Sequence, residues 1–441
     1  MRSLGVLAGA AVAAVGLAWA APCQASPEDI FGYGPRGAAM GATGAASAEG
    51  FEAAYSNPAL LSSVRRNKLT LGYLGATFGL DAEVAGERRR IGQDPARGTY
   101  IGAEVPVPLG GRLRDRIGLG LAFYTPTDII VRGRILYPEV PQFPLLPDRA
   151  QCLTVRGGLG GEVGWGIRVG IGFAALAEIT GDVTVATDAS GKVGTRVEDQ
   201  LVATYAPVLG VTYDLPIEEK IRLGLVYKGE MTARFAVAID GTKLSTLQIP
   251  VFNIAGIAQY DPAQATLEAA WTRGRRVVAA GATFKRWSKY PGPLESTLPC
   301  PADEPDCSTL TPPKIDYRDT LALHAGVDQG FALTPELALH LRAGAMFEPT
   351  PMPSSLPPSD AFDLATRKTT SLPTRFYDAS RVGLTAGVGI ALAARVPLTI
   401  DTFAQYHALL PREMRSEGDT TSEVTVSGRV LAGGMLVGVA F

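Results

Sequence analysis

Residues 167–180, IRVGIGFAALAEIT, alternate in character along the chain. One set of alternate positions, from Ile167 to Ile179, holds only apolar side chains, and the other holds mostly small, charged or polar ones. A strand that alternates in this way over about 10 residues can meet lipid with its apolar face. Residues 337–345 and 380–392 repeat the pattern. Because a soluble sandwich also alternates, the period alone does not decide the fold class.

The connections between the alternating segments favour a membrane barrel. Residues 164–166, 273–276 and 393–396 make tight turns, whereas residues 126–151 and 288–316 form long links that carry proline and charge. Tight periplasmic turns, long outer loops and an even strand count are typical of bacterial outer-membrane barrels. An even count also places both ends of the barrel on the periplasmic side. We predict fourteen strands, near residues 68–83, 98–108, 116–125, 152–163, 167–179, 200–213, 221–235, 263–272, 277–287, 317–328, 337–347, 380–392, 397–407 and 427–441.

The composition supports the same fold class. Hydrophobic residues make up 46% and charged residues 19% of the 441 residues, but no stretch behind the N-terminus approaches the roughly 20 apolar residues of a spanning helix. Strands cross lipid only when they close into a barrel, because an open edge would leave backbone groups unpaired. The net charge of −2 argues against nucleic acid as a partner. The terminal Phe441, on the apolar face of the last strand, points to the outer-membrane insertion machinery as a partner during biogenesis.

Residues 1–25 are predicted to form a cleaved signal peptide. Arg2 supplies a positive charge, residues 4–17 are apolar but too short to span a membrane, and two small-residue cleavage sites follow. Lipidation of Cys23 is the alternative, although Pro22 fits that signal poorly. We therefore expect an exported protein of the bacterial outer membrane.

Cysteine usage agrees with an oxidising compartment. Cys300 and Cys307 share a proline-rich segment and are predicted to form a disulfide that closes a small loop. A zinc site is discounted, because no histidine lies nearby in the sequence. We expect no metal and no cofactor, and Cys152 has no assigned role.

A segment of small residues precedes the first strand. Residues 32–61 are rich in glycine and alanine, lack a helical or strand period, and end near Asn57-Pro58-Ala59. Such a segment suggests a compact plug inside the barrel. Together with residues 262–264, 284–290 and 341–351, it resembles the FadL-type transporters of long-chain fatty acids and hydrocarbons.

The resemblance implies a fold and a function. The fold is all-β, a 14-stranded antiparallel transmembrane β-barrel (residues 67–441) with a small N-terminal hatch (residues 26–66) in its lumen, and Asn57, Pro58 and Ala59 as the hatch motif. The function is passive transport of hydrophobic molecules across the outer membrane. The resemblance also implies sideways release at a kinked third strand, expected here at residues 118–126.

The predicted lumen has small and apolar residues at inward positions such as Gly118, Ala122, Val430 and Leu436. This lining suits an apolar solute, because burying each methylene group contributes about 0.8 kcal/mol. The small residues also make room for the hatch, and the two explanations are compatible.

Polar residues at inward positions are the predicted ligand-binding residues of the lumen. An arginine in a low-dielectric lumen binds a carboxylate head group with two parallel hydrogen bonds. The alternative is structural, with Arg318 and Arg342 paired to Asp328, Glu49 or Glu52 and holding the hatch. The predicted residues are Arg318, Arg342, His324, Arg156 and Arg381.

Two long connections carry unusual apolar content. Exposed apolar loops are unfavourable unless they pack together or bind something. They are therefore predicted either to capture a hydrophobic ligand or to pack together as a lid. The candidate capture residues are Leu136, Tyr137, Phe143, Leu145, Val251 and Phe252.

Catalysis is not expected. The sequence has three histidines, no G-x-S-x-G motif and no histidine–cysteine pair at metal spacing, so no catalytic residue is predicted. The expected partners are a hydrophobic small molecule or fatty acid and outer-membrane lipid. A barrel with a structural or surface-adhesion role and a permanent plug is the alternative function.

Overall fold

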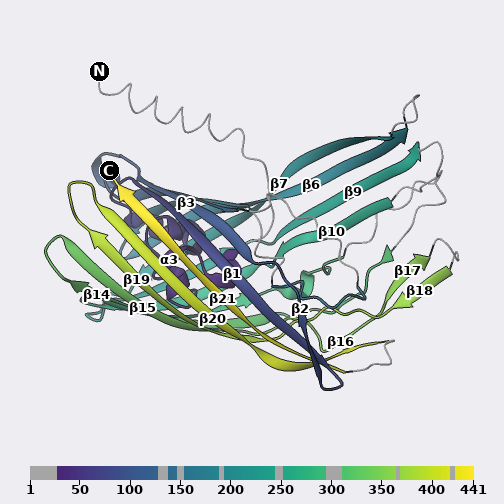
Figure 1. Ribbon diagram of the computed structural model, residues 1–441. Coiled ribbons are helices and arrows are strands. Elements are labelled where there is room, and N and C mark those ends of the chain that lie inside the picture. The colour runs from purple at the N-terminus through teal and green to yellow at the C-terminus, as the bar shows by residue number, and fades with distance from the viewer. Residues whose placement is uncertain are drawn as a thin grey trace.

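The computed structural model describes residues 27–127, 138–146, 153–187, 193–243, 252–294, 310–363, 368–417 and 423–441. Within these residues fourteen strands close an antiparallel barrel (Figure 1), which confirms the predicted fold class. In order around the wall they are β1 (Lys68–Val84), β3 (Ala96–Pro106), β4 (Ile117–Pro126), β5 (Thr154–Gly164), β6 (Ile167–Thr187), β7 (Val193–Asp214), β8 (Ile221–Lys228), β11 (Gln264–Arg273), β12 (Arg276–Lys285), β14 (Thr320–Ala332), β15 (Leu337–Glu348), β19 (Arg381–Leu392), β20 (Leu398–Ser416) and β21 (Val424–Ala440).

The two faces of the wall differ as the alternation predicts. On β21, Leu431 and Met435 are exposed, whereas Val430 and Leu436 are buried. On β6, Ile171 is likewise exposed and apolar. An outer face of large apolar side chains fits a lipid environment. None of the helices in the described part of the chain is long and apolar enough to span a membrane.

The predicted strand 221–235 is wrong in its second half. After β8, Gly229 and Glu230 lead into β9 (Met231–Lys243), which leaves the wall, pairs in parallel with β6, and pairs antiparallel with β10 (Phe252–Asp261). Met231 and Ala233 are buried against residues of β6 and β7, so the chain crosses the inner side of the wall there. Residues 252–261, predicted as part of a loop, are this second strand.

The longer elements gather at one end of the barrel. There β6, β7, β9 and β10 extend together beyond the rest of the wall (Figure 1). Tight turns such as that between β5 and β6 lie at the other end, which also holds the C-terminus. We call these the long-loop end and the short-turn end. The long-loop end also carries β2 (Glu87–Ile91), β13 (Leu310–Thr311), β16 (Ser355–Leu356), β17 (Ser359–Asp363) and β18 (Lys368–Leu372).

The N-terminal segment fills the lumen with short helices. Glycine and proline interrupt it too often for a long helix, and most of its side chains are buried. We call residues 27–63 the hatch. Its elements are α2 (Pro27–Phe31), α3 (Gly34–Ala39), η2 (Gly50–Glu52), α4 (Ala53–Ser56) and η3 (Pro58–Ser63).

Several sequence predictions lie outside the described residues. The signal peptide at residues 1–25 and the disulfide between Cys300 and Cys307 are among them, as are Cys152 and the capture residues Leu136, Tyr137 and Val251. These stay predictions. The expected kink in the third strand can be examined, because β4 is described in full. β4 pairs with β3 and β5 without a register shift, so its ladder shows no interruption at residues 117–124.

Candidate functional site

The Asn57-Pro58-Ala59 motif lies on a floor of glycines. Gly118, Gly160, Gly170 and Gly210 are successive register partners on β4, β5, β6 and β7. A Cβ atom on Gly160 would lie 2.2 Å from the carbonyl oxygen of Pro58, and one on Gly170 would lie 2.1 Å from the backbone nitrogen of Ala59. No side chain fits at such distances, so glycine is required for the hatch backbone to touch the wall. We call these four residues the glycine row.

Asn57 fastens the motif on both sides. Its Oδ1 accepts the N–H of Ala59 at 3.0 Å, which caps η3, and its Nδ2 donates to the carbonyl oxygens of Ala45 at 2.6 Å and of Val211 on β7 at 3.3 Å. Pro58 follows at the first position of the short helix, where its missing N–H leaves no gap. The motif is therefore an anchor that joins two parts of the hatch to the wall.

The opposite wall holds the hatch through side chains and two more glycines. Gly326, Gly344, Thr385 and Gln405 are successive register partners on β14, β15, β19 and β20. Thr385 Oγ1 accepts the N–H of Gly41 at 2.9 Å and donates to the carbonyl oxygen of Ala39 at 2.8 Å. Gln405 Nε2 donates to two further hatch carbonyl oxygens at 2.7 Å each. All these bonds end on hatch backbone groups.

Glu268 on β11 is a functional candidate that the sequence did not reveal. Its carboxylate accepts the N–H groups of Gly44, Ala45 and Ala46 at 2.7, 3.1 and 3.0 Å, and the hydroxyl of Ser47 at 2.8 Å. Converging backbone N–H groups form a site for a negative charge, and hydrogen bonds to a carboxylate are stronger than neutral ones. Glu268 is 1% exposed. It therefore clamps the glycine- and alanine-rich loop of the hatch to the wall.

His324, predicted to bind ligand, lies beside this clamp. Its Nε2 is 3.6 Å from Glu268 Oε2, and the side chain is buried. The imidazole therefore faces the carboxylate that holds the hatch. An inward acid opposite a run of small hatch residues is the only signal in the sequence that could have pointed to Glu268.

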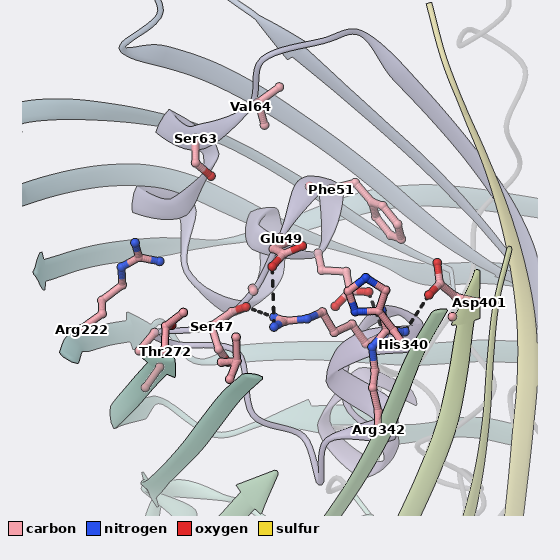
Figure 2. Close-up of a pocket in the computed structure, with 18 of the residues that line it drawn as sticks. Ser47, Glu49, Phe51, Ser63, Val64, Arg222, Thr272, His340, Arg342 and Asp401 are labelled. Atoms are coloured by element: carbon pink, nitrogen blue, oxygen red, sulfur yellow. Dashed lines mark hydrogen bonds and ion pairs between the residues drawn. The ribbon is translucent and has the colours of Figure 1, made fainter. Parts of the chain in front are cut away.

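Arg342 takes part in an ion-pair network beneath the hatch. Its Nη1 lies 2.6 Å from Asp401 Oδ1 (Figure 2). Its Nε lies 3.1 Å from Asp328 Oδ2. Asp328 is also 3.0 Å from Arg36 of the hatch and 2.9 Å from His340. For Arg342 the sequence left two alternatives, a carboxylate head group or a structural ion pair with an acidic residue. The structure shows an ion pair with Asp328.

The structure does not bring Arg318 and Arg342 together. Arg318 is exposed, precedes β14, and donates its backbone N–H to Pro351 at the long-loop end. Residue 328, the partner of Arg342, lies ten positions further on, or about 33 Å along an extended strand. The exposure pattern shows the reason, since both Arg318 and Asp319 are exposed and the alternation is broken just before the strand begins.

The two remaining predicted arginines are buried. Arg156 Nη2 lies 3.8 Å from Asp261, and its guanidinium is 5.2 Å from the ring centroid of the hatch residue Tyr55. Lys228 Nζ lies 3.3 Å from the same centroid, a close cation–π contact. Arg381 lies at the start of β19, near Asp378. Burial raises the pKa of Asp378 to about 6, against the opposing effects of a Thr350 hydrogen bond and of Arg381 and Arg412.

A polar cavity of about 780 Å³ lies between the hatch and the short-turn end. Arg342, His340 and Asp401 line it on the wall side, and Glu49 and Phe51 line it on the hatch side (Figure 2). On the other side of the hatch, beside Tyr33, Tyr55 and Lys228, a cavity measures about 70 Å³. The smaller volume admits a few water molecules, but an acyl chain would not fit. The hatch must therefore shift before a larger solute can pass this point.

Comparison with known proteins places this plugged barrel among solved structures. No family model matches the chain, and no curated protein matches its sequence. A FadL homologue of Pseudomonas aeruginosa matches with a TM-score of 0.54 and 14% identity over 96% of this chain and 98% of that one. The P. putida toluene transporter TodX matches with a TM-score of 0.54 and 15% identity over 94% and 99% of the two chains. The chain has the FadL fold. The CymD monoaromatic hydrocarbon channel agrees, with a TM-score of 0.53 and 14% identity over 93% and 97%.

In this barrel with the FadL fold, aromatic residues gather on the long-loop side. Tyr290 stacks on Tyr260 with ring centroids 4.8 Å apart, and it also contacts Tyr317 at 4.7 Å and Trp287 at 5.8 Å. All four side chains are buried. We call them the aromatic tier.

Two of the candidate capture residues are packed in the long-loop end. Phe143 and Leu145 are buried, and Phe143 makes an edge-to-face contact with Tyr377 at 6.0 Å. This arrangement is the lid alternative, and ligand capture stays a prediction for these residues. Phe252 begins strand β10 and does not lie in a loop.

Proposed function

We propose that this protein is a passive outer-membrane transporter of neutral hydrophobic molecules, with its short-turn end toward the periplasm. A general porin needs an open, water-filled lumen. This lumen is filled by a hatch, and side chains of several wall residues hold the hatch by hydrogen bonds to its backbone. The plugged barrel is the observation that carries the proposal. A concentration gradient of the solute supplies the driving force.

The polar groups favour hydrocarbons over fatty acids as solutes. A fatty acid requires a cation that is free to bind its carboxylate. Arg342 is instead engaged with Asp328 and Asp401. Arg156 lies beside Asp261 and Tyr55, and Lys228 lies against the face of the Tyr55 ring. The aromatic tier supplies apolar and edge-to-face contacts that suit an aromatic or aliphatic hydrocarbon. TodX and CymD, which share the fold, are described as hydrocarbon channels.

The proposed route has three steps. The solute enters between the apolar residues of the long-loop end and meets the aromatic tier. A shift of the hatch then joins the aromatic side to the polar cavity, because the space of about 70 Å³ beside Tyr55 is too small for passage. The solute leaves through the cavity of about 780 Å³ toward the periplasm.

A reversible lock tests whether the hatch must move. A Cβ atom on Gly120 of β4 would lie 3.3 Å from the Cβ atom of Ala54 in α4, close to the roughly 3.8 Å of a disulfide. We expect Ala54→Cys/Gly120→Cys, in a background without the native cysteines, to stop uptake when oxidised and to regain it with a reductant. Each single-cysteine variant serves as the control and should be insensitive to the oxidant.

Uptake of two labelled solutes tests the substrate class. Cells that lack their own FadL-type channel would express this protein and receive toluene or oleate. We expect expression to raise toluene uptake and to leave oleate uptake near the background level. If oleate is taken up and the oxidised disulfide variant stops this uptake, the protein is still a transporter, but the preference for neutral solutes is rejected. Uptake of neither solute would favour the structural or adhesive barrel.

A further inference from the structure

The turn between β3 and β4 is the longest link at the short-turn end and is rich in arginine. Residues 107–116, VPLGGRLRDR, contain three arginines and one acid. Arg66 lies just before β1, whose first residue Lys68 pairs with Glu104 at the end of β3. We call Arg66, Arg114 and Arg116 the basic foot of the wall.

The positive charge of the basic foot is not neutralised by the described residues around it. Arg66 and Arg116 make no ion pair with any residue in the described ranges. Arg114 lies 3.6 Å from Asp115, but the two side chains are 80% and 68% exposed, and exposed pairs of this kind contribute little. Glu162 on the adjacent strand β5 lies across from Arg116, but within the described residues its carboxylate makes no ion pair with that arginine, and the arginines of the foot outnumber Asp115 and Glu162. The foot therefore presents excess positive charge to its surroundings.

Apolar side chains surround the same place. Leu109 and Leu113 of the turn are 39% and 49% exposed, and the backbone N–H of the exposed Phe441 donates to the carbonyl oxygen of Asn67, next to Arg66. Trp165, at the adjoining β5–β6 turn, is 90% exposed. Arginine next to exposed leucine and tryptophan is the combination that lies at a lipid–water boundary, with the apolar groups in the acyl region and the charges among the head groups.

We propose that the basic foot binds the phosphate groups of anionic phospholipids in the periplasmic leaflet. A guanidinium matches two phosphate oxygens with parallel hydrogen bonds. A negatively charged membrane surface attracts each nearby arginine. A soluble anion would use the arginines alone, whereas a phospholipid also accounts for the exposed leucines of the same turn. The foot thereby sets which lipids border β3 and β4.

Trp165 provides a local probe of the lipid at the foot. The N–H of Glu162 on β5 donates to the carbonyl oxygen of Arg116 at 2.9 Å, so the Trp165 turn adjoins the foot. A Trp271→Phe background removes the partly exposed Trp271, and Trp287 stays because it is buried. Chains that begin at residue 26 would be reconstituted in vesicles that contain brominated phosphatidylglycerol or brominated phosphatidylcholine, and quenching of Trp165 would give the relative affinity for the two lipids.

We expect phosphatidylglycerol to bind about 5-fold or more tightly than phosphatidylcholine, since each arginine near a charged surface contributes about that factor. Arg66→Gln/Arg114→Gln/Arg116→Gln should bring the ratio close to one. The matched control, Arg88→Gln/Arg89→Gln/Arg90→Gln, removes three exposed arginines from the β2 hairpin at the long-loop end and should keep the wild-type ratio. Added salt should lower the wild-type ratio by screening.

Three outcomes would overturn the proposal. The first is equal quenching by the two lipids in the wild-type protein, which needs no variant and so is independent of how the variants fold. The second is an unchanged ratio in the triple variant of the foot. The third is complete loss of the preference when free glycerol phosphate replaces chloride at constant ionic strength, because this would identify a site for soluble phosphate instead of a lipid surface.

Discussion

At the glycine row of β4 to β7, a hydrogen atom in place of a side chain lets the hatch backbone lie directly on the wall. The contact distances of 2.0–2.2 Å for a Cβ atom on Gly118, Gly160, Gly170 or Gly210 leave no room even for alanine. The adjacent Gly161 faces the other way, and a Cβ atom there would meet nothing within 4 Å. The two neighbours therefore separate the effect of hatch contact from the general effect of replacing a strand glycine.

We expect Gly160→Ala to lift the motif off the wall and to destabilise the docked hatch by about 1–3 kcal/mol, the usual effect of overpacking. In planar bilayers the variant should show a higher frequency of open-channel events than the wild type. Gly161→Ala should behave as the wild type does. Equal conductance of the two variants would show that the glycine row does not control hatch docking.

Glu52 gives the hatch a dependence on pH. Its side chain is buried and accepts the N–H groups of Arg36 and Gly37 at 3.0 Å each, and burial raises its pKa from 4.5 to about 7. Between these two values the native protein holds a proton that the unfolded chain has released. Its contribution to stability is therefore complete below about pH 4.5 and is lost as the pH rises through about 7.

We expect the wild type to lose up to about 3 kcal/mol of stability relative to Glu52→Gln between pH 5 and pH 8. Glutamine mimics the protonated carboxyl group and does not titrate, so the difference between the two proteins isolates this group. Urea unfolding midpoints in detergent at both pH values would measure it. A difference that does not change with pH would contradict the assigned role of Glu52.

At the scale of elements, one side chain, that of Glu268, holds the hatch loop at residues 44–47 in position. Glu268 accepts four hydrogen bonds from this loop. An amide in its place would turn one accepting oxygen into a donor that faces other donors, at a cost of about 1–3 kcal/mol for the groups left unpaired.

We expect Glu268→Gln to speed amide hydrogen exchange in the peptide that covers residues 44–47, while the barrel strands keep their protection. Glu218→Gln is the matched control, because Glu218 is exposed in the β7–β8 link. If exchange in this peptide is equally slow in both variants, the clamp does not hold the loop.

The elements also show what sequence reasoning can and cannot predict. The barrel strands were predictable because contact with lipid imposes an alternating pattern. β9 and β10 were misjudged because they leave the wall, so no lipid face marks their register. Glu268 was missed because its partners are backbone N–H groups, which look alike at every residue. Arg318 was misplaced because the predicted strand began at residue 317, before the true start of β14 at Thr320.

For the whole molecule, the extension formed by β6, β7, β9 and β10 is separate from barrel closure. β5 pairs with β6 only up to Leu176, and β8 pairs with β7 only from Val208. Above these residues, β6 and β7 continue to pair with each other as far as Thr187 and Val193. The pairings that close the ring therefore do not depend on the projecting part of this hairpin.

We expect a chain in which residues 182–198 are replaced by Asn-Gly to fold into a closed barrel. Gly181 and Asp199 are register partners, so a two-residue turn can join them. Without heating, the shortened protein should keep the fast gel mobility of a folded barrel, and boiling should abolish it. Unfolded mobility without heating would show that the extension is needed for closure.

The seam between β1 and β21 pairs Lys68 with Ala440, so the ring closes only after nearly the entire barrel sequence is available. Pairings between such distant residues form late. The hatch precedes β1 and rests on the glycine row of β4 to β7, and all of these strands come before β21 in the chain. The hatch can therefore dock on β4 to β7 while the sheet is still open, and the sheet then closes around the docked hatch. A bulky residue in the glycine row would thus disturb assembly of the barrel, and not only transport by the finished protein.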